Sequence, residues 1–262
     1  MKFFQNRRFR DPAEDSEAVY ISEKFGVRSL HIGSDTIQSA MRVARPHELE
    51  ISYTRSMMAF LLFHPDPRQV LMVGLGGGSL AKFIYHRLPR TRAVAVEVNP
   101  RVVAVARQFF HVPPDDQRLA VVIGDGAIYV SNDKLTADVI MVDGYDAESQ
   151  VEALSTPGFY RDCARALGGA GILVVNLWGG DRNFTTCVER IAGVFDHRVA
   201  CLPAGKPGNV VVLAMRQSPG QPTWQELRAR AAGLERTYGL EFMRFVQELP
   251  AMNPHDRERL LL

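Results

Sequence analysis

Cysteine is scarce in this sequence and occurs in no ligand or redox pattern. The 262 residues include three cysteines, Cys163, Cys187 and Cys201, which are widely spaced and form no CxxC or Cys/His motif. Such spacing argues against a disulfide framework and against a structural zinc site. We therefore expect a protein that holds no metal and works in a reducing compartment, the cytoplasm.

Long apolar runs and an excess of one charge are also missing. No apolar stretch reaches the roughly 18 residues of a membrane span, and the opening MKFFQNRRFRD lacks the apolar core of a signal peptide. The formal net charge of +2 is too small to favour nucleic acid or an anionic membrane as partner. We expect a soluble cytoplasmic protein whose partners are small molecules, with no nucleic acid and no membrane.

The first quarter of the chain has a different pattern from the rest. Residues 17–40 contain short alternating stretches and tight-turn signals, as in small antiparallel sheets. Apolar residues then recur at helical spacing in RPHELEISYTRSMMAFLLFH, and the sequence PDP at 65–67 ends this helix. We divide the chain into an N-terminal β-strand and hairpin region with a linking helix, residues 1–64, and a nucleoside-binding catalytic domain, residues 65–262.

From residue 69 on, apolar strands alternate with helical patterns. Five aliphatic stretches, QVLMVGL, AVAVEV, LAVVIGDG, ADVIMVDG and GILVVNLW, are typical of parallel strands covered on both faces. Two more, RVACLP and NVVVLAM, are joined by the loop AGKPG, which is too short for a parallel crossover. The sequence therefore predicts an α/β fold of the methyltransferase-like Rossmann type, a mostly parallel seven-stranded sheet that ends in an antiparallel hairpin. A capping box at Thr223 and Glu226 predicts one further helix.

A glycine-rich turn follows the first of these strands, in VLMVGLGGGSLAKF. Gly74, Gly76, Gly77 and Gly78 let a ligand approach the backbone closely, and a helix from Ser79 directs its first amides into the turn. The motif GLGGGS lacks the GKS or GKT ending of a P-loop, which argues against a nucleoside triphosphate. The turn alone indicates a nucleotide or nucleoside site, or a tight turn that binds nothing.

Acidic residues end the next two strands. Glu97 follows the turn by about 20 residues, where a carboxylate is placed to accept hydrogen bonds from the ribose hydroxyls of an adenosine. The alternative, for a glutamate taken by itself, is a surface charge. Asp125, beside Gly124 and Gly126, is placed to accept from the exocyclic amine of adenine, or alternatively to cap a turn or helix. With the glycine turn, these residues lie along the crevice where open α/β sheets bind ligands.

Two aspartates follow the fourth strand, in MVDGYDAES. Asp143 and Asp146 are three residues apart at the mouth of the same crevice. Together they could hold a cationic amine and accept its proton as it attacks, with Tyr145 as a wall of the pocket. The alternative is a pair of solvated loop aspartates.

These residues, in this order, resemble the polyamine aminopropyltransferases, that is, spermidine synthase and its relatives. The resemblance runs from DTIQSA through GLGGGS, VEVNP, GDG and VDGYD to STPGFYRDCARALGGAGILVVN. It implies transfer of an aminopropyl group from decarboxylated S-adenosylmethionine, as co-substrate, to an amine such as putrescine, with release of methylthioadenosine. It implies neither a metal nor a tightly bound cofactor, because the sulfonium is already an activated leaving group, and it implies a homodimer or homotetramer.

The resemblance also assigns roles to single residues. It makes Asp143 the acid/base group, and Asp146 and Tyr53 its neighbours in the catalytic set. The residues on the donor side are the four glycines of the turn with Glu97, Asp125, Gly126 and Gln38.

This chain departs from the family's pattern in the glycine turn and the amine site. Gly77 stands where the family has an aspartate, whose charge would repel the carboxylate of intact S-adenosylmethionine by several kcal/mol at ~4 Å and an effective dielectric of ~20. The family's Tyr-His-Glu is Tyr53, Thr54 and Arg55 here, so a cation could replace an acid. In the last hairpin AGKPGN replaces Tyr-Pro-Ser-Gly, and VVNLWGG differs as well.

Three functions therefore remain open at this point. The first is a spermidine synthase-like aminopropyltransferase with an altered amine site, which the family architecture favours. The second is a methyltransferase or other transferase that uses intact S-adenosylmethionine, which the missing loop aspartate favours. The third is a nucleoside-binding homologue without catalysis, against which the four acidic residues argue. We expect the first, and with it an acidic cavity beside Asp143 that Arg55 does not enter.

Overall fold

The N-terminal part of the chain forms a small antiparallel sheet. The computed structural model describes residues 18–144, 151–205 and 208–262. Strands β1, β2 and β3 pair in that order, with the bounds Val19–Lys24, Val27–Ile32 and Ser39–Arg42. Phe25 and Gly26, both with positive φ, make the two-residue turn between β1 and β2, as the right-handed twist of a hairpin requires.

A short helical segment links this sheet to the rest. Helix α1 (Ser52–Met57) continues into a 3₁₀ turn, η1 (Met58–Leu62). Helical spacing had predicted an earlier start, near Leu49, and the helix is shorter than this. The carboxylate of Glu50 pairs with Arg42 of β3, so the residues before α1 form turns that lie against the small sheet.

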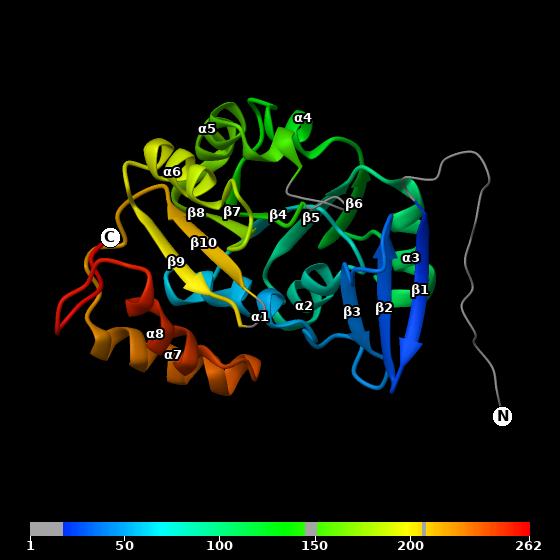
Figure 1. Ribbon diagram of the computed structural model, residues 1–262, viewed down its shortest axis with the longest axis horizontal. Helices are drawn as coiled ribbons and strands as arrows, with labels where there is room; N and C mark the ends of the chain where they lie inside the picture. Colours follow the sequence, from blue (N-terminus) through cyan, green and yellow to red (C-terminus); the bar gives the residue numbers. More distant parts are fainter. Residues whose placement is uncertain (1–17, 145–150, 206–207) are drawn as a thin grey trace.

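The main sheet has seven strands in the order β6-β5-β4-β7-β8-β10-β9. Strands β4 to β8 are parallel, and β10 is antiparallel to both β8 and β9. This confirms the predicted methyltransferase-like Rossmann fold with its antiparallel end (Figure 1). The strand bounds are Gln69–Val73 (β4), Arg92–Glu97 (β5), Leu119–Ile123 (β6), Ala137–Val142 (β7), Leu167–Trp178 (β8), Val199–Pro203 (β9) and Asn209–Met215 (β10).

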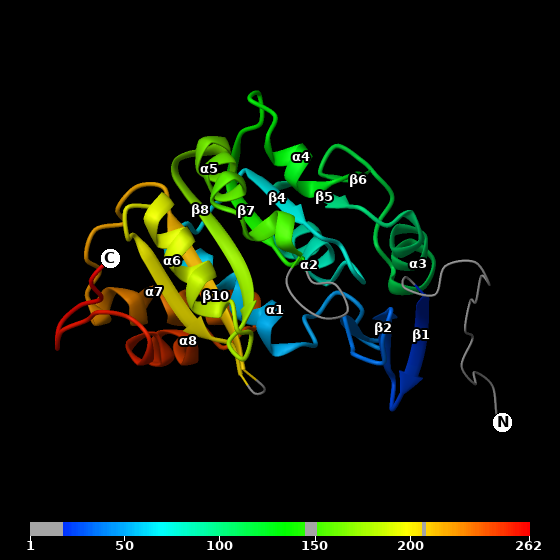
Figure 2. The same cartoon turned by 45° about the horizontal axis from the view of Figure 1, so that its top comes forward.

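Helices cover both faces of the main sheet (Figures 1 and 2). The connecting helices have the bounds Ser79–Arg87 (α2), Pro100–Phe110 (α3), Gly126–Val130 (α4), Pro157–Ala166 (α5) and Phe184–Val194 (α6). After the sheet come α7 (Trp224–Tyr238), which opens with the predicted capping box, and α8 (Phe242–Glu248); two further 3₁₀ turns are η2 (Glu152–Ser155) and η3 (Leu249–Ala251).

The alternation of side chains along the strands divides the core in two. Val70 and Met72 of β4 face the core shared with α1, α2, α7 and α8, whereas Leu71 and Val73 face the core shared with α4, α5 and α6. A third cluster joins the small sheet to α3, where Leu30 and Met41 pack on that helix. The small sheet therefore packs on α3 and lies at the side of the main sheet where β6 is the edge strand (Figure 1).

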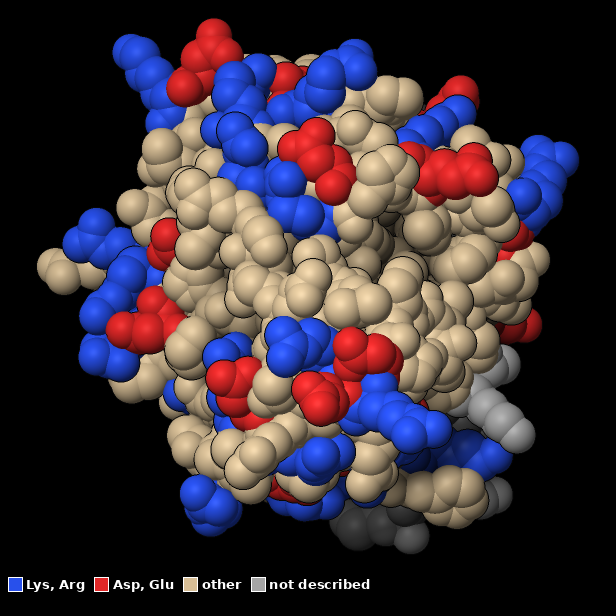
Figure 3. Space-filling model, turned by 90° about the vertical axis from the view of Figure 1, so that its left-hand side faces the viewer, with Lys and Arg blue, Asp and Glu red and all other residues tan. Residues whose placement is uncertain are grey.

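Charged side chains of both signs are interspersed on the face at the β9 edge of the sheet, around a band of uncharged residues (Figure 3). Within the residues that the structure describes, no helix is long and apolar enough to cross a membrane. Within the same residues, no three His, Cys, Asp or Glu side chains are grouped as metal ligands.

Candidate active site

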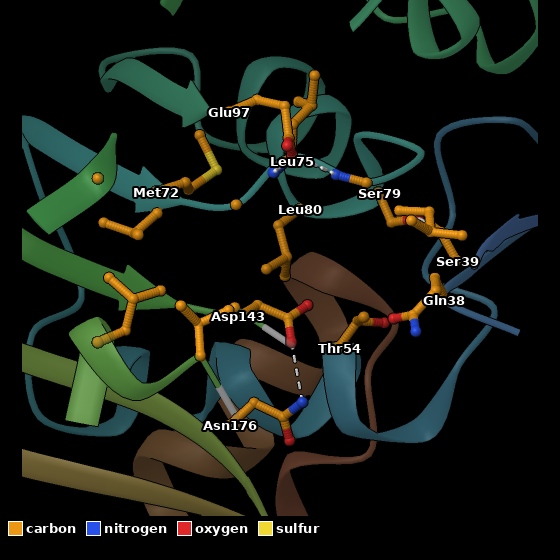
Figure 4. Close-up of a pocket in the computed structure, with 18 of the residues that line it drawn as sticks. Gln38, Ser39, Thr54, Met72, Leu75, Ser79, Leu80, Glu97, Asp143 and Asn176 are labelled. Carbon is orange, nitrogen blue, oxygen red and sulfur yellow. Dashed lines mark hydrogen bonds between the residues drawn. The ribbon is translucent and has the colours of Figure 1, made fainter. Parts of the chain in front are cut away.

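A cavity of about 750 Å³ opens at the carboxyl ends of the parallel strands, between the main sheet and the small one (Figure 4). Among its described lining residues are three carboxylates, Glu97, Asp125 and Asp143, and no Lys, Arg or His. The cavity is therefore acidic, which suits a sulfonium and an ammonium ion. The sequence had placed all three carboxylates at successive strand ends, and the structure brings them to one cavity.

The glycine turn forms one wall of the cavity, and its four glycines have different structural roles. Gly74 and Gly76 have positive φ and line the cavity. A Cβ on Gly74 would lie 2.4 Å from the carbonyl oxygen of Asp143, so only glycine allows β4 and β7 to approach this closely. Gly78, also with positive φ, lies against Val112, and its Cβ would be 2.2 Å from that side chain.

Gly77 lies behind the turn rather than on the cavity wall. A Cβ there would be 2.7 Å from the Ser39 hydroxyl oxygen and 2.9 Å from a ring carbon of Phe110. An aspartate at this position would therefore require Ser39 of the small sheet and Phe110 of α3 to shift. Ser39 in turn lies 3.3 Å from the Ser79 hydroxyl, and both serines line the cavity. Uncharged hydroxyl groups take the place of a carboxylate in this region.

Glu97 is nearly buried and is held by backbone amides. One carboxylate oxygen accepts from the amides of Leu75 (3.0 Å) and Gly76 (3.5 Å), and the other from the amide of Asn99 (3.0 Å). The glutamate at the end of β5 is therefore fixed against the glycine turn, at the position predicted to bind ribose.

Asp125 and Gly126 also line the cavity. Asp125 accepts from the amides of Ala127 and Ile128, at 2.7 and 3.1 Å, and so caps α4. Asp125 is therefore both a helix cap, which was the alternative prediction, and a residue of the cavity wall. A Cβ on Gly126 would lie 2.4 Å from Val73, so α4 packs against β4 only with glycine at its start.

Asp143 lies at the end of β7 with both carboxylate oxygens bound. Oδ2 accepts from the hydroxyl of Tyr53 at 3.0 Å. Oδ1 accepts from the amide nitrogen of Asn176 at 2.9 Å (Figure 4). Burial raises the pKa of Asp143, although these two hydrogen bonds oppose the shift. A carboxylate that is held in place and has a raised pKa is suited to accept a proton from an amine.

Other predicted residues fall around this carboxylate. Gln38 lines the cavity on the side of Thr54 (Figure 4), and Trp178 lines it at the end of β8. Arg55 does not line the cavity: its guanidinium donates to Glu241 at 2.8 Å and to the carbonyls of Leu49 and Glu50. The cation that the sequence allowed in the amine site thus points away from it, toward the C-terminal helices.

Asn176 and Asn209 lie in the site although the sequence did not predict them there, and two predicted residues lie outside the part of the chain that the structure describes. Asn209, the first residue of β10, lines the cavity and donates to the side chain of Asn176 at 3.0 Å. Only the register of β10 on β8 reveals this contact, because the residues are far apart in the sequence. Asp146 and its neighbour Tyr145 lie outside the described residues.

Comparison with known proteins identifies the family of this chain. The model of the spermine/spermidine synthase domain matches residues 50–192. The polyamine aminopropyltransferase of Chromobacterium violaceum is 46% identical over 256 residues, which cover 98% of each chain. A spermidine synthase in complex with the transition-state analogue AdoDATO has the same fold, with a TM-score of 0.71, 21% identity and coverage of 94% of this chain and 89% of the other.

A methyltransferase-like protein is among the similar structures as well. Human methyltransferase-like protein 13 in complex with SAH has a TM-score of 0.66 and 25% identity, over 72% of this chain and 92% of the other. The family model and the identity over nearly the whole length decide between these likenesses. By both measures, this chain belongs to the spermine/spermidine synthase family.

Proposed function

We propose that this protein transfers an aminopropyl group from decarboxylated S-adenosylmethionine to an amine such as putrescine. The observation that carries the proposal is Asp143, held between Tyr53 and Asn176 in an acidic cavity beside the glycine turn. Its polyamine aminopropyltransferase relatives and the spermidine synthase fold support the reaction.

The proposed roles follow the geometry of the cavity. Glu97, fixed by the amides of the turn, accepts hydrogen bonds from the ribose, and Asp125 lies where adenine would bind. Gly74 and Gly76 let the nucleoside approach the backbone. The donor is a co-substrate that leaves as methylthioadenosine, so no tightly bound cofactor takes part.

The chemical step is a displacement at carbon. The amine gives a proton to Asp143 and attacks the aminopropyl carbon next to the sulfonium; the new C–N bond forms as the C–S bond breaks. The electron pair of that bond goes to sulfur, which becomes the neutral thioether of methylthioadenosine. The raised pKa of Asp143 brings its basicity closer to that of the amine, and the bonds from Tyr53 and Asn176 keep the carboxylate oriented.

The test is product formation by the wild type and by an isosteric variant. Decarboxylated S-adenosylmethionine and putrescine should yield spermidine and methylthioadenosine in equal amounts, measured by mass spectrometry. Asp143→Asn should lower kcat by about 10²- to 10⁴-fold, the usual contribution of a general base. Asp133→Asn is the matched control, because Asp133 is exposed and lies outside the cavity. Equal rates for wild type and Asp143→Asn would contradict the proposal.

A second candidate function keeps the fold and changes the donor. Gly77 replaces the loop aspartate, and the nearest groups to a Cβ there are Ser39 and Phe110, which carry no charge that would repel the carboxylate of intact S-adenosylmethionine. A methyltransferase or other transferase would use this donor. Calorimetric titration with both donors separates the two: tighter binding of the intact form, together with transfer of its methyl group, would replace the first proposal.

We also propose the organisation that the family suggests. Residues 65–262 would be the catalytic domain, residues 1–64 the N-terminal region, and the protein a cytoplasmic homodimer or homotetramer. The cavity lining from both the small and the main sheet supports a catalytic unit that needs the two regions together. Sedimentation equilibrium at several concentrations would give the oligomeric state directly.

A further inference from the structure

Asn209 is connected to the proposed proton acceptor by a chain of two hydrogen bonds. Its side-chain nitrogen donates to Oδ1 of Asn176 at 3.0 Å, and the nitrogen of Asn176 donates to Oδ1 of Asp143 at 2.9 Å. Asn176 is 3% exposed, so water does not readily replace either bond. Both asparagines and Asp143 line the cavity.

The sheet topology places these side chains on one face. In the antiparallel pairing of β10 with β8, Val211 lies opposite Asn176 and Asn209 lies opposite Trp178. Residues two apart on a strand share a face, so Asn209 is the diagonal neighbour of Asn176. This contact exists because β10 inserts between β8 and β9.

The direction of the chain is set by the carboxylate at its end. An ionised carboxylate only accepts hydrogen bonds, so Asn176 must turn its NH₂ group toward Asp143 and its oxygen toward Asn209. Asn209 must then donate, as it does. Without this donor, the buried Asn176 oxygen loses the hydrogen bond from Asn209, and the carboxamide is held less firmly in the orientation that donates to Asp143.

We propose that Asn209 is a positioning residue for the transfer: by fixing the orientation of the Asn176 carboxamide, it keeps Asp143 ionised and correctly oriented. This inference rests on the proposed role of Asp143 and extends it to the antiparallel end of the sheet. Asn209 does this without itself taking up the proton.

The most direct test follows the ionisation of Asp143 in the free protein. The side-chain carboxyl of Asp143 is titrated by ¹³C NMR in wild type and in Asn209→Leu, which keeps the shape of the side chain and removes the donor; Asp143→Asn assigns the signal. We expect the pKa of Asp143 to rise by about one unit, a typical share of a hydrogen bond to a charged group. The other titratable groups described at the cavity are Tyr53, Glu97 and Asp125. The Asn209→Leu substitution removes none of these side chains.

A double-mutant cycle separates positioning from direct contact with the amine. In an Asn176→Ala background, Asn209→Leu should leave the Asp143 titration where it is, because the relay is already broken. In the Asn209→Leu single variant, the acidic limb of the plot of kcat against pH should shift upward by the same amount as the pKa of Asp143. The KM for the donor should not change. Asn132→Leu, in an exposed turn, is the matched control and should change neither.

Two results would overturn the inference. One is an Asp143 titration that is the same in wild type and in Asn209→Leu, with both proteins shown by melting to be folded. The other is an Asn209→Leu effect that persists undiminished in the Asn176→Ala background. Since the NMR titration needs no turnover, it judges this inference even if aminopropyl transfer is not observed, and that failure would concern the proposed function alone.

Discussion

The buried amine of Lys82 gives the stability of this protein a pH dependence that one substitution can isolate. Lys82 lies on α2, directly after the glycine turn, and is 1% exposed. Its ammonium donates to the carbonyl oxygen of Phe110 at 2.7 Å. Loss of hydration lowers the pKa of Lys82 from 10.5 to about 8, because burial disfavours the charged form.

The sign and the size follow from this shift. Between about pH 8 and pH 10.5 the unfolded chain holds a proton on Lys82 that the folded chain has lost, so the free energy of unfolding rises with pH in this window. Below pH 8 the folded protein carries the full cost of the buried charge. At 1.36 kcal/mol per pH unit, that cost is about 3 kcal/mol.

Lys82→Met keeps the length of the side chain and removes both the charge and the hydrogen bond to Phe110. The lost bond costs about 1 kcal/mol. We therefore expect the variant to be about 2 kcal/mol more stable than wild type at pH 7 and about 1 kcal/mol less stable above pH 10.5. Urea unfolding at both pH values measures the two differences, and Lys134→Met, at an exposed position, is the control. A difference of the same size and sign at both pH values would refute this account of Lys82.

Two further substitutions test how the structure accommodates its unusual residues. Gly77→Asp should lower the free energy of unfolding by about 1–3 kcal/mol, because its Cβ would meet Ser39 at 2.7 Å. In a melting experiment, a Ser39→Gly change in the same chain should recover part of the loss. A single variant as stable as wild type would contradict this account of the turn. Arg55→Leu should cost about 1–2 kcal/mol in urea unfolding, because it breaks the pair with Glu241 and two bonds to carbonyls. Its kcat should stay within about twofold of wild type, and a much larger loss would contradict the position of Arg55 outside the cavity.

Much of the fold could be predicted because its signals are local. The loop AGKPG is too short for a crossover, and that alone required the antiparallel end of the sheet that β9 and β10 form. Glu97, Asp125 and Asp143 lie at or within two residues of the carboxyl ends of their strands, and parallel strands bring such residues to one edge. Sequence position and sheet topology together were enough to place them.

Gly77 and Arg55 show what the sequence could not indicate. Both depart from the family's pattern, and each could have changed the charge of the cavity. Gly77 instead lies against Ser39 of the small sheet, and Arg55 pairs with Glu241, which is 186 residues away. The outcome depends on contacts between distant segments, and no local period or turn motif encodes such contacts.

Asn176 and Asn209 are a second case in which a contact between distant segments decides the structure of the site. The segments VVNLWGG and AGKPGN both differ from the family's pattern, and in AGKPGN the difference removes an aromatic wall. In the structure the two asparagines form one unit, since the carboxamide of Asn176 binds Asp143 only in the orientation that Asn209 supports. Whether the amine site is altered in its choice of acceptor stays a prediction. Because each asparagine depends on the other, a substitution of either one alone would break this pair, and a test of that choice has to change both positions together.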